Sequence, residues 1–188
     1  MTHSEQVPLI VDLDGTLHAS DLSWKLFASA ALRRPHRIPY ALGLWLFRSK
    51  AAMKCWLVPF ASIDIAALHW HQDVLEHVRR ERGQGRKVIL ATGTPQPLAQ
   101  ECNHYLDDLF DDVMGTSDAV NLIGSNKARA LISRYGDGRF DYIGNSAQDL
   151  AVWPHCRGIL LAYTSDAVRR DAEALNLPIL GRFPASSG

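Results

Sequence analysis

Residues 9–17 have the sequence Leu-Ile-Val-Asp-Leu-Asp-Gly-Thr-Leu, an apolar run followed at once by two carboxylates two positions apart. Side chains alternate along a strand, so a strand ending here would direct Asp12 and Asp14 to the same side. Open α/β sheets bind their ligands at the carboxyl ends of the strands, and Gly15 allows the backbone to turn there. Two crowded carboxylates are costly unless a cation or a reaction uses them, so this stretch indicates a site rather than an ordinary turn.

Strand-like and helical segments alternate after the first strand. Short apolar runs bounded by turn residues predict four further strands, at 87–91, 112–115, 140–143 and 158–162. Helical patterns separate or follow them, at 65–82, 97–106, 125–135 and 147–153. This alternation predicts an α/β fold with a central parallel sheet and helices on both faces. The last residues, 183–188, are expected to form a loose tail.

The interval 18–63 breaks this alternation, because it contains no convincing strand. A helical pattern begins at Leu22, two prolines and a basic cluster interrupt it at 33–39, and a strongly apolar stretch continues to Phe60. We interpret this interval as a small helical cap, inserted after the first strand and covering its end. The core domain would then comprise residues 1–17 and 64–188.

Composition narrows the class of protein. With 188 residues, 47% of them hydrophobic, the chain can bury one sizeable core. Lys and Arg (20) balance Asp and Glu (20), so no overall field favours nucleic acid. The N-terminus lacks a secretion signal, and no run of about 18 apolar residues spans a membrane, so we expect a cytoplasmic protein. Three isolated cysteines, Cys55, Cys102 and Cys156, suggest neither a disulfide framework nor a zinc site.

Two further polar groups follow predicted strand or helix boundaries. Thr92, Gly93 and Thr94 come after the second strand, where a hydroxyl and free N–H groups could hold a phosphate oxygen. The alternative is an ordinary turn in which Thr94 caps the next helix. Lys127 lies near the start of helix 125–135, either as a surface lysine or as a charge that neutralises a phosphate and a nearby carboxylate.

The loop 144–149 (GNSAQD) follows the fourth predicted strand. Asn145 and Asp149 could each supply an oxygen to a hard cation. The alternative is a helix start, with Asn145 or Ser146 as the capping residue and Asp149 favoured by the helix dipole.

Together these pieces resemble the haloacid dehalogenase (HAD) superfamily, whose pattern is DxDGT, a strand-end Ser or Thr, a Lys and a GDxxxD-type loop, in that order. The resemblance implies a Rossmann-like three-layer fold with a helical cap, and phosphatase chemistry. Asp12 would be the nucleophile that forms an aspartyl-phosphate, and Asp14 the acid/base. Thr92 and Lys127 would hold the transferring phosphoryl group, and Gly15, Thr16 and Gly93 would contribute to substrate binding.

The resemblance also implies Mg²⁺ as cofactor, held by Asp12, the backbone carbonyl of Asp14, Asn145 and Asp149. Asn145 stands where most members of the superfamily have an acid. We therefore expect weaker metal affinity, because the site holds one negative charge fewer.

Segments 121–128 (NLIGSNKA), 140–153 (FDYIGNSAQDLAVW) and 90–92 (LAT) resemble the phosphatase-like domain at the N-terminus of some UbiA-type membrane prenyltransferases. This implies a phosphorylated sugar on a polyprenyl carrier as substrate, with a prenyltransferase or the inner face of the membrane as a contact. The apolar stretch 40–60, with its basic neighbours, either lies in a membrane interface or packs its own apolar face.

Two other functions remain open. The chain could be a soluble small-molecule phosphatase of the phosphoserine phosphatase type, whose cap is also helical and follows the first motif. It could also be a non-catalytic partner of a membrane prenyltransferase, which Asn145 favours and the intact Asp12, Asp14, Thr92 and Lys127 oppose. We interpret the three histidines of the region 69–77 as ordinary helix-surface residues rather than a zinc site.

Overall fold

The computed structural model describes residues 7–184. Six parallel strands form one sheet in the order β3-β2-β1-β4-β5-β6. Their bounds are β1 Leu9–Val11, β2 Val88–Pro95, β3 Asp112–Thr116, β4 Asp141–Gly144, β5 Gly158–Ala162 and β6 Ile179–Phe183. Three expectations concern residues outside this range: the lack of a secretion signal at the N-terminus, the first six residues of the core domain, and residues 185–188 of the tail.

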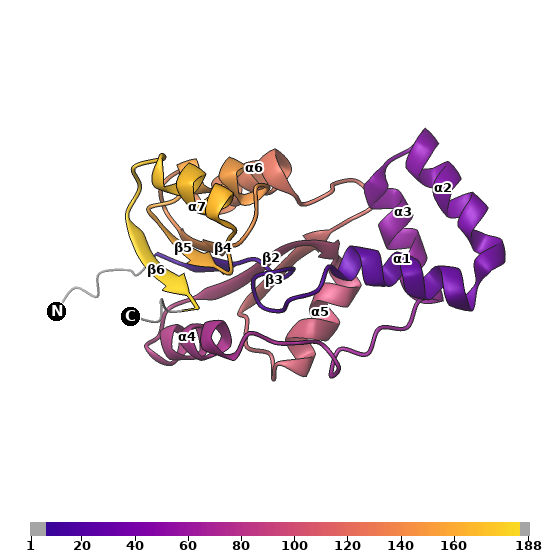
Figure 1. Ribbon diagram of the computed structural model, residues 1–188, viewed down its shortest axis with the longest axis horizontal. Coiled ribbons are helices and arrows are strands. Elements are labelled where there is room, and N and C mark those ends of the chain that lie inside the picture. The colour runs from indigo at the N-terminus through magenta and orange to yellow at the C-terminus, as the bar shows by residue number, and fades with distance from the viewer. Residues whose placement is uncertain (1–6, 185–188) are drawn as a thin grey trace.

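Strand β1 is short but lies in the middle of the sheet, between β2 and β4 (Figure 1). Ile10 is paired with Ile89 on one side and with Tyr142 on the other. Alternation sends Leu9 and Val11 into one apolar cluster and Ile10 into a second. Because both faces are apolar, the strand requires helices on both sides.

Those helices form two layers. Helices α4 (Gln72–Gly83) and α5 (Gln96–Tyr105) cover one face, and α6 (Gly124–Tyr135) and α7 (Asp166–Glu173) cover the other (Figure 1). The predicted α/β fold with a central parallel sheet and three layers is confirmed.

The segment predicted as a cap forms helices α1 (Leu22–Arg33), α2 (Ile38–Phe47) and α3 (Lys50–Leu57), with 3-10 turns η1 (Pro35–Arg37) and η2 (Val58–Phe60). These helices pack around a separate apolar cluster of Leu26, Ala30, Ala41, Met53 and Leu57. They project to one side of the sheet (Figure 1). Among residues 7–184, no helix combines the length and apolar character that crossing a bilayer requires.

Two predicted helices were wrong in extent or kind. The helix predicted over 65–82 begins only at Gln72, because residues 64–70 form a turn in which Ile65 O accepts hydrogen bonds from Leu68 N and Trp70 Nε1. The helix predicted over 147–153 is instead two 3-10 turns, η3 (Asp149–Ala151) and η4 (Trp153–His155).

Two elements near the C-terminus were not predicted. Helix α7 is largely charged, and Ala172 is its one buried residue. Strand β6 lies at the edge of the sheet and none of its residues is fully buried, so its apolar signal is weak. Phe183, which we assigned to the tail, is the last residue of this strand.

Candidate active site

A cavity of about 310 Å³ lies between the carboxyl end of β1 and the cap, lined mainly by polar and charged side chains. The chain turns beside it at Gly15, whose φ of 78° is unfavourable for other residues. A Cβ at Gly15 would also lie 2.0 Å from the Asn145 side-chain amide nitrogen. The positive φ favours glycine at this position, and any other residue would also displace the Asn145 side chain.

Asp12 and Lys127 form a buried ion pair at the floor of this cavity. Lys127 Nζ lies 2.6 Å from Asp12 Oδ1 and 2.8 Å from the hydroxyl of Tyr142. Tyr142 in turn donates to Asp149 Oδ1 at 2.8 Å, and Lys127 Nζ lies 3.8 Å from the same oxygen. Asp12 directly follows β1, Lys127 lies on α6 and Asp149 begins the 3-10 turn η3, and Tyr142 on β4 links the last two. Tyr142 was missed, because from the sequence it is simply one apolar residue of a buried strand.

This network carries surplus negative charge. Burial raises the pKa of Asp12 to about 7; Lys127 opposes this shift, while Asp149 and Asp14 add to it. Burial lowers the pKa of the Lys127 amine, but the neighbouring Asp12 and Asp149 outweigh it and raise that pKa above its usual value. The proton therefore stays on Lys127. The raised pKa of Asp12 means that Lys127 alone does not offset burial and the neighbouring acids, so a further cation beside Asp12 would favour its charged form.

Asp14 is held by hydrogen bonds to both of its oxygens. Thr94 Oγ1 donates to Asp14 Oδ2 at 2.7 Å, and the Leu22 N–H donates to Oδ1 at 2.8 Å. Burial raises the pKa of Asp14, and these two hydrogen bonds oppose the rise. His18 Nε2 lies 3.6 Å from Oδ1, but burial lowers the pKa of His18 to about 4, so the imidazole is neutral near pH 7. A carboxyl that is fixed in orientation and has a raised pKa suits proton transfer.

The sequence suggested a helix-capping role for Thr94, and its hydrogen bond to Asp14 was not predicted. The signal was present, because Thr92 and Thr94 are two apart on a strand that continues to Pro95. Thr92 is fully buried, and its hydroxyl accepts a hydrogen bond from Thr94 N at 3.0 Å. In the described chain the cavity is lined by Gly93 and not by Thr92. Thr16 is also buried, with its hydroxyl 3.4 Å from Asp12 Oδ2.

The loop after β4 is organised by Asp149. Its Oδ2 accepts hydrogen bonds from the backbone N–H groups of Asn145 and Ser146, each at 3.0 Å, and from the Ser146 hydroxyl at 3.2 Å. Both carboxylate oxygens of Asp149 are therefore engaged within the protein. Asn145 Oδ1 is different, since among residues 7–184 it is a buried acceptor without a hydrogen-bond partner.

Asp12, Asp14 and Asn145 could supply oxygen ligands to a hard cation, one of them neutral. Residues 7–184 hold no cluster of three His, Cys, Asp or Glu that could bind a metal, so a cation would also need neutral oxygens. The unpartnered Oδ1 of Asn145 is one such oxygen, and Asp12 and Asp14 line the same cavity. Oxygen-only ligation of this kind is what Mg²⁺ prefers.

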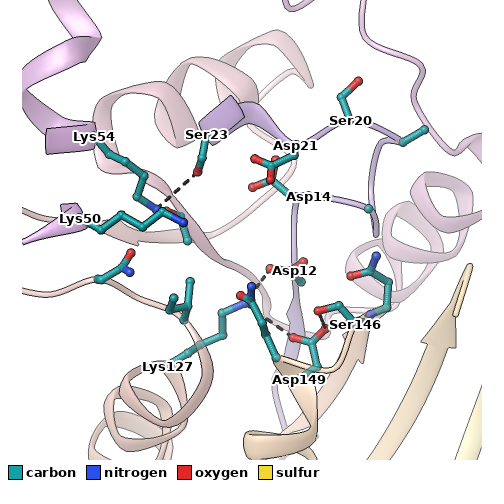
Figure 2. Close-up of a pocket in the computed structure, with 17 residues that line it drawn as sticks. Asp12, Asp14, Ser20, Asp21, Ser23, Lys50, Lys54, Lys127, Ser146 and Asp149 are labelled. Atoms are coloured by element: carbon teal, nitrogen blue, oxygen red, sulfur yellow. Dashed lines mark hydrogen bonds and ion pairs between the residues drawn. The ribbon is translucent and has the colours of Figure 1, made fainter. Parts of the chain in front are cut away.

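The cap contributes two further lysines to the cavity (Figure 2). Lys54, on α3, is only 3% exposed, and its Nζ donates to Gly93 O and contacts Ser23 Oγ at 3.4 Å. Lys50 lies one turn earlier on α3 and also lines the cavity. The sequence showed both only as part of a basic flank; their spacing of four residues, which places them on the same face of a helix, was the available signal.

Known proteins match this chain in sequence and in structure. It is 33% identical over 156 residues to an uncharacterized protein of Sinorhizobium fredii, y4nM; the match covers 83% of this chain and 30% of y4nM. This chain thus spans less than a third of that relative's length. A Bordetella pertussis protein of unknown function has a similar structure, with a TM-score of 0.69 at 15% identity over 92% of this chain and 96% of that one.

Two other solved structures share the fold. A substrate-bound phosphoserine phosphatase gives a TM-score of 0.63 at 10% identity, covering 94% of each chain. A dehalogenase gives 0.58 at 11% identity, covering 98% of this chain and 95% of that one. The sequence model of the haloacid dehalogenase-like hydrolase family matches residues 9–153. This range includes Asp12, Lys127 and Asp149. The chain belongs to the haloacid dehalogenase-like hydrolase family.

Proposed function

We propose that this hydrolase cleaves phosphate monoesters through a covalent phosphoryl intermediate on Asp12. The observation that carries the proposal is the Asp12–Lys127 pair at 2.6 Å, which lies at a polar cavity. Asp14, two residues after Asp12, lines the same cavity and is held by its own hydrogen bonds. A lysine in this position stabilises the charge of the phosphoryl oxygens as they come to lie beside Asp12.

The two aspartates take different parts of the reaction. An oxygen of Asp12 attacks phosphorus, the bond from phosphorus to the substrate oxygen breaks, and Asp14 gives that oxygen its proton. Asp14 then accepts a proton from water, whose oxygen attacks phosphorus and releases phosphate and free Asp12. The raised pKa of Asp14 and its fixed orientation support this role.

We propose Mg²⁺ as the cofactor, held by Asp12, the main-chain carbonyl of Asp14 and Asn145. A bound Mg²⁺ would offset the repulsion between Asp12 and the incoming phosphate. Asp149 also fixes the loop after β4, because its oxygens accept hydrogen bonds from Tyr142, Asn145 and Ser146. Ligation by Asp149, predicted from the sequence, stays a prediction.

For the substrate, we propose a phosphorylated sugar on a polyprenyl carrier, in line with the resemblance to the domain beside UbiA-type prenyltransferases. The polar cavity supports a phosphosugar headgroup, and the uncovered apolar side chains of the cap support a lipid nearby. A soluble phosphosugar or phosphoamino acid is the rival substrate, favoured by the polar lining alone.

The experiment compares wild type with Asp12→Asn and Asp21→Asn in Mg²⁺, on p-nitrophenyl phosphate and a panel of soluble and lipid-linked phosphosugars. Asp21 lines the same cavity and caps α1 by accepting a hydrogen bond from Trp24 N, which Asn also does, so this variant is the matched control. Asp12→Asn should be inactive and Asp21→Asn active, and acid quenching of wild type should trap a phosphoryl adduct. Equal inactivity of all three proteins across the panel would leave the non-catalytic alternative standing.

A further inference from the structure

Helix α2 leaves most of its apolar side chains uncovered. It has ten residues, none of them charged, and Ala41 is the one that is buried. The most exposed are Phe47 (84%) and Leu46 (76%), followed by Tyr40 (59%), Trp45 (56%) and Leu42 (43%). Single exposed apolar residues are ordinary, but five large ones on one ten-residue helix mark a binding surface.

The charge around this helix is of one sign. Between residues 22 and 63 there are seven Lys and Arg and no Asp or Glu, although the whole chain has 20 of each. Arg33, Arg34 and Arg37 precede α2, Arg48 follows it directly and Lys50 begins α3; all five are exposed. The uncovered apolar helix is therefore flanked at both ends by cations.

The position and length of α2 suit a flat surface. It lies in the part of the cap away from the sheet (Figure 1), so the core does not obstruct it. Its ten residues span about 15 Å, half of the ~30 Å hydrocarbon core of a bilayer, so the helix would lie along a membrane rather than cross it. Tyr40 and Trp45 are residue types that favour the level of the lipid headgroups.

We propose that α2 docks on the surface of an anionic lipid bilayer, with its apolar side chains at headgroup depth and the flanking arginines against the lipid phosphates. Two observations favour this occupant over others. A second copy of the chain, docked face to face, would bring the two basic caps together and repel. A nucleic acid would use the cations but leave the apolar helix uncovered.

The experiment measures co-sedimentation of the full chain with vesicles of equal parts phosphatidylglycerol and phosphatidylcholine, and with pure phosphatidylcholine vesicles. Wild type should bind the anionic vesicles and be released at ~0.5 M salt, where charges are screened within a few ångströms. Leu46→Ser/Phe47→Ser should bind at least about tenfold more weakly, because two exposed apolar side chains are lost. The control Val120→Ser/Leu180→Ser changes two exposed apolar residues outside the cap and should bind like wild type.

Three outcomes would overturn the proposal: wild type remaining in the supernatant at low salt, the α2 variant binding as tightly as the control, or sedimentation equilibrium showing a dimer that the α2 variant abolishes. Asp12→Asn should bind vesicles as wild type does. Vesicle binding and catalysis therefore fail independently, and loss of one leaves the other intact.

Discussion

The hydroxyl of Thr94 offers a direct test of the acid/base assignment. It is buried and donates to Asp14 Oδ2 at 2.7 Å, one of two hydrogen bonds that fix this carboxyl. Thr94→Val keeps the shape of the side chain and removes only the donor. Asp14 then retains the Leu22 N–H and can rotate about it.

The expected loss follows from the strength of one hydrogen bond to an ionised group, about 1.5–3 kcal/mol. If that energy holds Asp14 in its reactive orientation, kcat should fall between about 10-fold and about 100-fold, at ~1.4 kcal/mol per factor of ten. The hydrogen bond also lowers the pKa of Asp14, so its removal should move the pH profile of kcat/KM to higher pH.

Steady-state phosphatase assays across pH, with urea unfolding as a check on stability, measure both effects. The control is Thr116→Val: Thr116 is equally buried, and its hydroxyl bonds to the backbone at Gly93 O and Leu122 N rather than to Asp14. This control should retain kcat within a factor of about two. A Thr94→Val enzyme with unchanged kcat and an unshifted profile would refute the acid/base role of Asp14.

Four further predictions concern the same region. Lys127→Met should lower the free energy of unfolding by about 3–5 kcal/mol, because it leaves Asp12 buried without its partner; urea unfolding should show partial recovery when Asp12→Asn is added, and no recovery would mean that the pair is not coupled. Asn145→Asp should lower the Mg²⁺ concentration for half-maximal activity about tenfold and lower the Tm of the metal-free protein; an unchanged activation constant together with an unchanged Tm places this side chain off the metal. Lys54→Met should raise KM for phosphate monoesters more than it lowers kcat, since it removes a cation from the cavity wall; equal KM values for the two enzymes across the substrate panel would exclude this lysine from binding. Finally, burial lowers the pKa of His18 from 6.5 to about 4, so between these two values the unfolded chain binds more protons than the native one. From pH 7 to pH 5 the free energy of unfolding of wild type should therefore fall by about 2 kcal/mol more than that of His18→Asn; the same pH dependence in both proteins would contradict this.

The sequence was sufficient for the sheet because its buried strands carry strong local signals. Leu9, Ile10 and Val11 are apolar on both faces of the sheet, and β5 and the residues 88–91 of β2 and 142–143 of β4 are apolar too. Strand β6 was missed because it lies at the sheet edge, where the pattern of burial is weak. Helix α4 was predicted too long because nothing in the periodicity marks the turn stabilised by Ile65 O.

The candidate site was predictable where a residue follows a strand, and not where it depends on tertiary placement. Asp12 and Asp14 were identified from their place after a strand, and Lys127 through the resemblance to the haloacid dehalogenase superfamily; the structure brings all three to one cavity. Tyr142 and Lys54 were not. An apolar strand gives no sign of which side chain faces a site, and the four-residue spacing of Lys50 and Lys54 shows a shared helix face without showing that this face meets the cavity. Thr92 has the expected position but a hydroxyl directed to Thr94 N, so its contact with phosphate stays a prediction.

The central position of β1 has a consequence for how this protein can change over evolutionary time. Asp12 directly follows β1, which is hydrogen-bonded to β2 and β4, and Lys127 comes from α6, so the core alone positions these two groups. Lys50 and Lys54 come from a separate helical unit with its own apolar cluster. Substitutions in that unit can alter which molecule is admitted while Asp12 and Lys127 keep their geometry. Asp14 is the exception, because its Oδ1 accepts a hydrogen bond from Leu22 N at the start of α1, so changes at that end of the unit also reach the chemistry.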